Sequence, residues 1–214
     1  MTSPRPISNN SQPDNSHIIA PYVTAWSEEM FTQAKIVRRP SGGIAYADEK
    51  LTDRDNNGIL WPRTPHRPGI GRPEFGAVHP LRQRRAMRRL LCQVCAGPAD
   101  QTPDGTLWLL QDHREDWPNW PENMAVTEPP VCRDCVTLST RLCPALRKGS
   151  AVIRARRFPI VGVYGVLHTQ DPTPTPVGTV TLSFDNSAVR WLRAGGLARE
   201  LHDCAILTPD DLHR

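Results

Sequence analysis

The sequence predicts an α+β fold in which a four-cysteine module is flanked by β-rich segments and followed by a C-terminal helix. Four of the six cysteines form two C-x-x-C pairs: Cys92 with Cys95, and Cys132 with Cys135. The stretch "GTVTLSFD" (178–185) alternates apolar and polar residues, which is typical of a strand with one buried face. By contrast, "HPLRQRRAMRRLL" (79–91) consists of good helix formers and has a proline at the first helical position.

The first half of the chain is expected to have a polar tail, a hairpin region and then the cysteine module. Residues 1–18 are rich in Ser, Asn and Pro and are expected to form a disordered tail. Residues 19–80 are expected to contain a β-hairpin over 42–61, with Asn-Asn-Gly at its turn, and then a loop rich in Pro and Gly. Residues 81–149 hold a basic helix and the two C-x-x-C pairs.

The last region, residues 150–214, is expected to add β-strands and a helix. The stretch 151–169 is rich in β-formers, whereas "SAVRWLRAGGLARELHDC" (187–204) predicts a helix that its two glycines weaken. The most apolar run, 158–167, is too short to span a bilayer, and the N-terminus has no apolar signal segment. We therefore expect a cytoplasmic protein with reduced thiols and no membrane partner.

The two C-x-x-C pairs predict a structural zinc site formed by Cys92, Cys95, Cys132 and Cys135. Two residues between thiols let both sulfurs reach one ion, and two such pairs supply the four thiolates of a tetrahedral zinc site. A redox pair or an iron–sulfur cluster is the alternative, and the expected compartment disfavours disulfides. Cys143 and Cys204 have no close second cysteine and are expected to be buried free thiols.

The order of elements in this module is that of a zinc treble clef: knuckle, hairpin, helix. The 36 residues between the two pairs leave room for a strand pair around "GTLWLLQDH" (105–113) and for a loop. A helix is expected to begin near Cys132. The positive end of its dipole would stabilise thiolates in the first turn.

The segment "CQVC…LQDHRE…VCRDC" resembles the treble clef of the HNH endonuclease family, and His113 precedes Cys132 by 19 residues. The resemblance implies that His113 activates water as a general base and that Asp112 binds a hydrolytic divalent ion. The family usually has an asparagine and a second metal ligand at the positions of Thr127 and Val136. Without that ligand, charge stabilisation at the leaving phosphate is incomplete, so we expect the scaffold without the nuclease.

Arginines crowd the segment before the first knuckle. Between residues 63 and 89 there are eight arginines and a single acid, Glu74. Five of them lie in the expected helix: Arg82, Arg84, Arg85, Arg88 and Arg89. Such a surface makes strong, salt-sensitive contacts with nucleic-acid phosphates. The alternatives are a solvated helix paired with acids of the same chain, and an acidic protein partner. Trp117 and Trp120 either stack on bases or, as we expect, pin their loop to the core.

These features together predict a zinc-stabilised nucleic-acid-binding or regulatory protein without catalytic activity, which contacts DNA or RNA through the basic helix. The first alternative is an HNH-like metal-dependent endonuclease that uses His113 and Asp112. The second is an adaptor that binds other proteins through the zinc module. The chain as a whole also resembles uncharacterised actinobacterial proteins that share "HPLRQRRAMRRLLCQVC" and "LCPALRKG".

Overall fold

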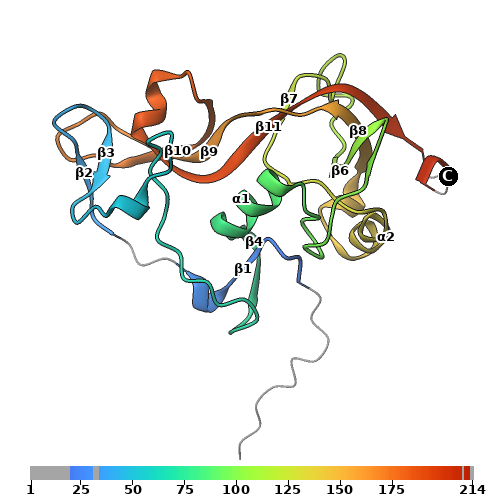
Figure 1. The fold of residues 1–214 in the computed structure, drawn as a ribbon, viewed down its shortest axis with the longest axis horizontal. Coiled ribbons are helices and arrows are strands. Elements are labelled where there is room, and N and C mark those ends of the chain that lie inside the picture. The colour runs from blue at the N-terminus through green and yellow to red at the C-terminus, as the bar shows by residue number, and fades with distance from the viewer. Residues whose placement is uncertain (1–19, 31–33, 209, 213–214) are drawn as a thin grey trace, which may run out of the picture.

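A computed structural model describes residues 20–30, 34–208 and 210–212 of the chain (Figure 1). The predicted disordered tail, residues 1–18, lies outside these ranges. The described chain is α+β, as predicted, and consists mostly of strands with two α-helices. Within the same ranges, no helix is long and apolar enough to cross a membrane.

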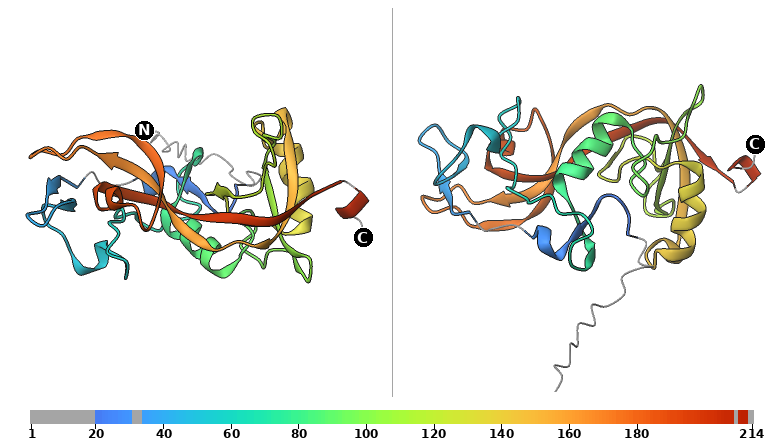
Figure 2. Two further views of the ribbon diagram at one scale, coloured as in Figure 1. Left: turned by 90° about the horizontal axis from the view of Figure 1, so that it is seen from above. Right: turned by 60° about the horizontal axis from the view of Figure 1, so that its bottom comes forward.

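A long two-stranded ribbon organises the fold. Its first arm comprises β8 (Ser150–Arg157) and β9 (Ile160–His168), and its second arm is β11 (Leu192–Leu207). The arms run antiparallel, with Val152 opposite Leu207 at one end and Leu167 opposite Leu192 at the other. The 16 residues of β11 give it a length of about 50 Å. Figure 2 shows the ribbon running along most of the molecule.

Shorter strands extend the ribbon at both ends. They are β10 (Pro176–Ser183), β6 (Gly105–Gln111), β5 (Gln101–Thr102) and β7 (Met124–Val126). The strand order is β10-β9-β11-β8-β6-β5, and β7 pairs with β11 outside this path. The strands predicted over 151–169 and 178–185 and the strand pair predicted around 105–113 are therefore confirmed.

The helix predicted over 187–204 is wrong. Residues Ser187–Trp191 form a short 3-10 helix, and the rest of the segment belongs to β11. Its residues favour helices locally, but burial in the sheet decides its conformation. Leu197 and Leu201 pack in two different hydrophobic clusters while the backbone pairs with β9, β7 and β8. Tertiary pairing overrides helix propensity here.

Two small sheets come from the N-terminal region. They pair β1 (Thr24–Trp26) with β4 (Pro73–Val78), and β2 (Ile36–Arg38) with β3 (Ile44–Tyr46). The hairpin predicted over 42–61 is wrong in extent, because β3 pairs with the strand before it. Only an isolated bridge between Arg54 and Leu60 closes the Asn-Asn-Gly turn. The reason is a 3-10 turn after β3, in which the Asp53 carboxylate accepts the Lys50 N–H at 2.7 Å and ends the extended chain.

Helix α1 (Pro80–Arg89) lies across the middle of the ribbon, and the predicted basic helix is confirmed (Figure 1). The side-chain amide of Gln83 donates to the Leu197 carbonyl and accepts from the Leu197 N–H, both at 2.9 Å. Arg199 of β11 donates to the Met87 carbonyl at 2.6 Å. Buried hydrogen bonds to both halves of α1 therefore fix the helix on β11.

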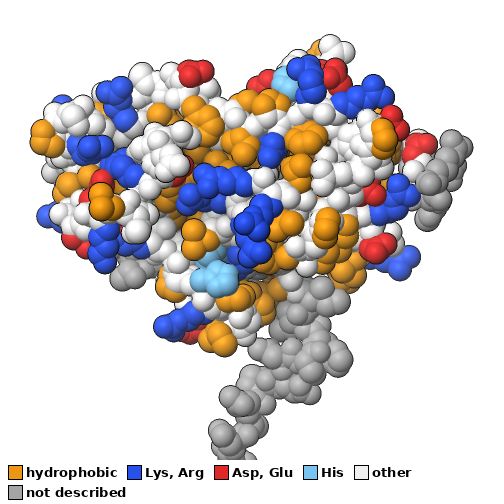
Figure 3. Space-filling model, in the orientation of Figure 1, with side chains coloured by type: hydrophobic (Ala, Val, Ile, Leu, Met, Phe, Trp, Pro, Cys, Tyr) orange, Lys and Arg blue, Asp and Glu red, His pale blue; other side chains and the backbone are white. Residues whose placement is uncertain are grey.

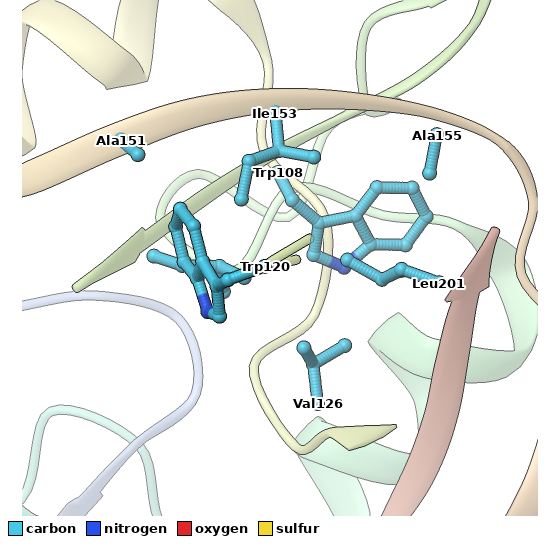
Figure 4. Packing of buried hydrophobic residues seen from close by; sticks show 8 residues of the cluster. Trp108, Trp120, Val126, Ala151, Ile153, Ala155 and Leu201 are labelled. Carbon is cyan, nitrogen blue, oxygen red and sulfur yellow. The ribbon is translucent and has the colours of Figure 1, made fainter. Parts of the chain in front are cut away.

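One hydrophobic core lies between β6, β8 and β11, with helix α2 (Arg133–Leu142) beyond it. Figure 4 shows Trp108 packed beside Ile153 and Leu201. Trp120 joins this core and is 4% exposed, whereas Trp117 is 40% exposed. Trp120 therefore pins its loop, as predicted, because a buried indole removes a large apolar area from water. For Trp117 the same prediction is wrong, because its side chain is exposed.

Candidate metal centre and basic surface

The four predicted metal ligands come together in the structure. All four Sγ atoms lie within 4.8 Å of one another: those of Cys92, Cys95, Cys132 and Cys135. A tetrahedral site with metal–sulfur bonds of about 2.3 Å places its sulfurs about 3.8 Å apart. The Sγ atoms of Cys95 and Cys132 are 3.7 Å apart. The group can therefore hold one metal ion.

The first ligand pair lies in a tight turn directly after α1. The N–H of Cys92 donates to the Gly97 carbonyl at 2.7 Å, and the N–H of Ala96 donates to the Cys92 carbonyl at 3.0 Å. Ala96 reverses the chain in the left-handed conformation, with φ of 62°. Gly97 packs beside the Cys95 Sγ, which would lie 3.4 Å from a Cβ at this position. This turn holds both thiols in one knuckle.

The second ligand pair lies at the start of α2. Cys132 is the N-cap residue, and the N–H of Cys135 donates to its carbonyl at 3.1 Å. Val131 and Val136 are 0% and 3% exposed and pack with residues of β6, which fixes where the helix begins. The positive end of the helix dipole then faces the sulfurs and favours thiolates.

Hydrogen bonds and ion pairs hold the two ligand pairs together. The N–H of Gln93, between the first two ligands, donates to the Pro130 carbonyl at 3.0 Å, just before α2. The Asp100 carboxylate pairs with Arg154 of β8 at 2.7 Å and with Arg133 of α2 at 3.4 Å. Cys143 and Cys204, predicted to be buried, are both half-buried, and neither belongs to the four-cysteine group.

Within the four-cysteine group, burial opposes ionisation of the thiols when no cation is bound. It raises the pKa of Cys132 to about 11, and with the neighbouring sulfurs it raises the pKa of Cys135 further. Burial acts the same way at Cys92, but the backbone N–H groups of Cys132, Cys95 and Val94 outweigh it and lower that pKa. A bound cation removes the protons from coordinating thiols, so the group fits a cation site.

Arg82 does not belong to the basic surface. It is 2% exposed, and its guanidinium donates two bonds of 2.6 Å to the two carboxylate oxygens of Glu29. The prediction that Arg82 contacts nucleic acid is therefore wrong. Helical spacing gives the reason, because Arg82 lies one turn before Ala86 and shares the buried side of α1 with Gln83 and Met87.

The other four arginines of α1 reach the surface: Arg84, Arg85, Arg88 and Arg89. The guanidinium of Arg84 lies over the Trp61 ring, 3.9 Å from its centroid, and Arg88 lies 4.0 Å from the Asp55 carboxylate. Arg85 and Arg89 are exposed, and neither is paired with an acid in the described part of the chain. Basic side chains gather over α1 near the centre of the face shown in Figure 3.

The Asp-His pair of the HNH resemblance follows β6 in a loop. Arg114 donates to the Oδ2 atom of Asp112 at 2.6 Å and to its Oδ1 atom at 3.1 Å, and this bonding lowers the pKa of Asp112. The Nδ1 atom of His113 lies 2.6 Å from a carboxylate oxygen of Asp116. Val136, where the family usually has a metal ligand, is buried in the core of the module.

Comparisons of the chain with protein-family models, with curated proteins and with solved structures find no match. The resemblances to HNH endonucleases and to actinobacterial proteins therefore stay predictions. Function has to be inferred from the residues and their geometry.

A cavity beside α1 was not predicted. Tyr164 of β9 and Gly195 of β11 are among its lining residues. The sequence signal was the Gly195-Gly196 pair, because glycines inside a strand mark bulges and close backbone approach. Within a segment expected to be helical, the same pair indicates only a weak point in the helix.

Proposed function

We propose that this protein is a zinc-stabilised nucleic-acid-binding protein without catalytic activity. Four thiols at tetrahedral spacing favour zinc, which prefers sulfur and nitrogen ligands in that geometry. The knuckle, the β5–β6 hairpin and α2 then form a zinc treble clef. The ion has a structural role, because four protein ligands leave no position open for a substrate.

The exposed side of α1 is the observation that carries this proposal. Arg85 and Arg89 lie one turn apart, have no acidic partner among the described residues and directly precede the knuckle. Arg88 adds a third positive charge, which Asp55 partly balances. Because α1 is hydrogen-bonded to β11, these side chains project from a fixed element. A fixed array of arginines binds phosphates strongly and in a salt-dependent way.

The double variant Arg85→Gln/Arg89→Gln tests the proposal. If each arginine contacts one phosphate, affinity for DNA or RNA falls roughly ten-fold or more at about 50 mM salt, and the salt dependence of log K falls by about 1.5 in slope. Fluorescence anisotropy with labelled oligonucleotides measures both quantities. The matched control is Arg141→Gln/Arg147→Gln, which removes the same charge from exposed residues in and after α2 and leaves both quantities nearly unchanged.

Two outcomes contradict the proposal. An equal loss of affinity in both double variants would indicate a response to net charge alone. Failure of the unmodified protein to bind DNA or RNA at low salt would favour the protein adaptor instead.

The environment of His113 supports a second candidate function, an HNH-like metal-dependent endonuclease. The carboxylate of Asp116 beside Nδ1 can orient the imidazole as a general base. Two observations argue against this candidate. The Asp112 carboxylate, which would bind the metal ion, already accepts hydrogen bonds from Arg114. The position of the second metal ligand is taken by Val136, which is buried among apolar residues. DNA cleavage that requires Mg2+ or Mn2+ and disappears in His113→Ala would decide for it, and no cleavage by the unmodified protein would decide against it.

A further inference from the structure

A cavity of about 340 Å³ lies beside α1. One wall comes from β4 and the first turn of α1, through Val78 and Pro80. The other wall comes from β9 and β11, through Tyr164, Gly165 and Gly195. Gly195 is the extra residue where the register between β9 and β11 shifts. Such bulges are frequent next to functional sites, because they re-aim the residues around them.

The cavity combines flat apolar surface with positive charge. The Tyr164 residue is 38% exposed, and glycine backbone lies beside its ring. A Cβ on Gly195 would lie 3.8 Å from the carbonyl oxygen of Tyr164 and 4.0 Å from its ring, so a side chain fits there in contact with Tyr164 and without a clash. Among the described lining residues the only charged side chain is that of Arg193, and there is no carboxylate.

Two arginines of α1, Arg84 and Arg88, lie on the side of the helix that begins at this cavity, next to Arg85 and Arg89. Pro80 lines the cavity, and Arg84 and Arg88 follow at one-turn intervals, about 6 and 12 Å further along the helix axis. Arg84 also lies over Trp61, whose neighbour Pro62 lines the cavity. A row of phosphates bound along α1 would therefore end beside the cavity.

We propose that the cavity receives one unpaired base of a single-stranded nucleic acid, stacked on Tyr164, while phosphates of the same strand lie along α1. This inference rests on the proposed function. A single strand suits both parts of the surface, because such strands are bound by a basic groove together with aromatic platforms. A base within a duplex is paired and stacked, so it enters a cavity only after it flips out.

An acidic peptide fits only half of this surface. Its carboxylates would pair with the arginines of α1, but they gain nothing from an exposed aromatic ring beside glycine backbone. A planar base gains stacking at that ring and van der Waals contact with the glycine backbone. The cavity therefore favours the nucleic acid.

Three probes of equal length separate base binding from phosphate binding. They are a labelled oligothymidylate, the same strand paired with oligoadenylate, and an abasic strand that keeps the sugar-phosphate backbone. We expect the oligothymidylate to bind tightest and the abasic strand to bind roughly ten-fold more weakly. Anisotropy titrations of all three probes measure these differences.

Two variants change the cavity by different routes. Gly195→Val fills it, since a Cβ there has room, and Tyr164→Leu removes the ring. Each should weaken oligothymidylate binding roughly ten-fold and leave abasic binding unchanged. Trp117→Leu is the matched control, because it removes another exposed ring that does not line the cavity, and it should bind all three probes like the unmodified protein.

Several results would overturn the inference while leaving the proposed function intact. The first is that both cavity variants, at normal zinc content, bind oligothymidylate as tightly as the unmodified protein. The second is that the unmodified protein binds all three probes equally. The third is that Trp117→Leu loses oligothymidylate binding while the cavity variants keep it. Tighter binding of a polyglutamate of equal charge would assign the surface to acidic peptides. Unchanged binding of every probe in Arg85→Gln/Arg89→Gln would contradict the proposed function itself.

Discussion

Glu29 and Arg82 form a buried ion pair, in which Glu29 is 1% exposed and Arg82 is 2% exposed. The Glu29 carboxylate also accepts the backbone N–H groups of Trp26 at 2.9 Å and of Arg67 at 2.8 Å. Burial by itself raises the pKa of Glu29, but Arg82 and the two N–H groups outweigh it and hold that pKa at about 2. The pair joins the turn at Ser27–Glu29 to α1.

This low pKa predicts how stability depends on pH. A carboxyl group whose pKa is lower in the folded state stabilises the protein above its unfolded pKa of 4.5, and that contribution disappears as the pH falls towards 2. The shift corresponds to a contribution on the order of 3 kcal/mol. Glu29→Gln should therefore destabilise the protein at about pH 7 by roughly 3 kcal/mol, and this difference from the unmodified protein should shrink by about pH 2.5.

Urea unfolding at both pH values measures the difference. Glu28→Gln is the matched control, because Glu28 is exposed and adjacent, and it should change stability little at either pH. A difference between Glu29→Gln and the unmodified protein that stays constant with pH would show that the pair does not lower the pKa of Glu29.

Buried and exposed arginines look alike in the sequence. Arg82 and Arg199 lie in the core, whereas Arg85 and Arg89 are exposed. Each buried guanidinium has fixed acceptors, the Glu29 carboxylate in one case and backbone carbonyls in the other. These acceptors lie far away in the sequence, so no local pattern identifies them. For Arg82 alone, the helical spacing to the apolar side of α1 was a usable clue.

Among the elements, the cysteine module was the most predictable part of the chain. The spacing within each C-x-x-C pair predicts a local turn that carries both thiols. The positions of the knuckle, of the hairpin and of the start of α2 could therefore all be predicted from the sequence. Strand β11 shows the opposite case. Its apolar alternation changes phase at the bulge after Ala194, so the sequence lacks the regular pattern of a strand, and its residue types favour a helix instead. Only the pairing with distant strands specifies it.

The module also gives a prediction about metal dependence. Cys135→Ser removes one of the four thiols of the proposed zinc site and should lower the zinc content of the purified protein well below one ion per chain. Because metal binding is coupled to folding, the unfolding temperature should fall on the order of 10 °C. Metal analysis and calorimetry measure the two effects. Cys143→Ser is the matched control, since Cys143 ends the same helix outside the ligand group, and it should retain zinc. Full zinc content and normal stability in Cys135→Ser would contradict the assigned site.

Over the whole molecule, β11 connects two separate hydrophobic clusters. Near its start, Leu197 packs with Trp61, Met87 and other residues, and Leu201 packs with Trp108 in the core beneath β8. The same strand carries the hydrogen bonds that fix α1. The two ends of the molecule therefore share one backbone element, which no domain division along the sequence reveals. We infer that they unfold together, because loss of β11 removes the support of both clusters.

Two truncations in β11 test this cooperativity. Leu197→Ala and Leu201→Ala each remove a side chain that is at most 2% exposed, at a cost of about 2–5 kcal/mol, which lowers the unfolding temperature by roughly 5–20 °C. If β11 unites the molecule, calorimetry shows one transition in both variants, and backbone amides of β10 and β6 lose protection from hydrogen exchange together. Two calorimetric transitions would contradict this inference, especially if Leu197→Ala lowered the temperature of only one of them and reduced protection only in β10. The two ends would then fold independently, and the long ribbon would merely link them.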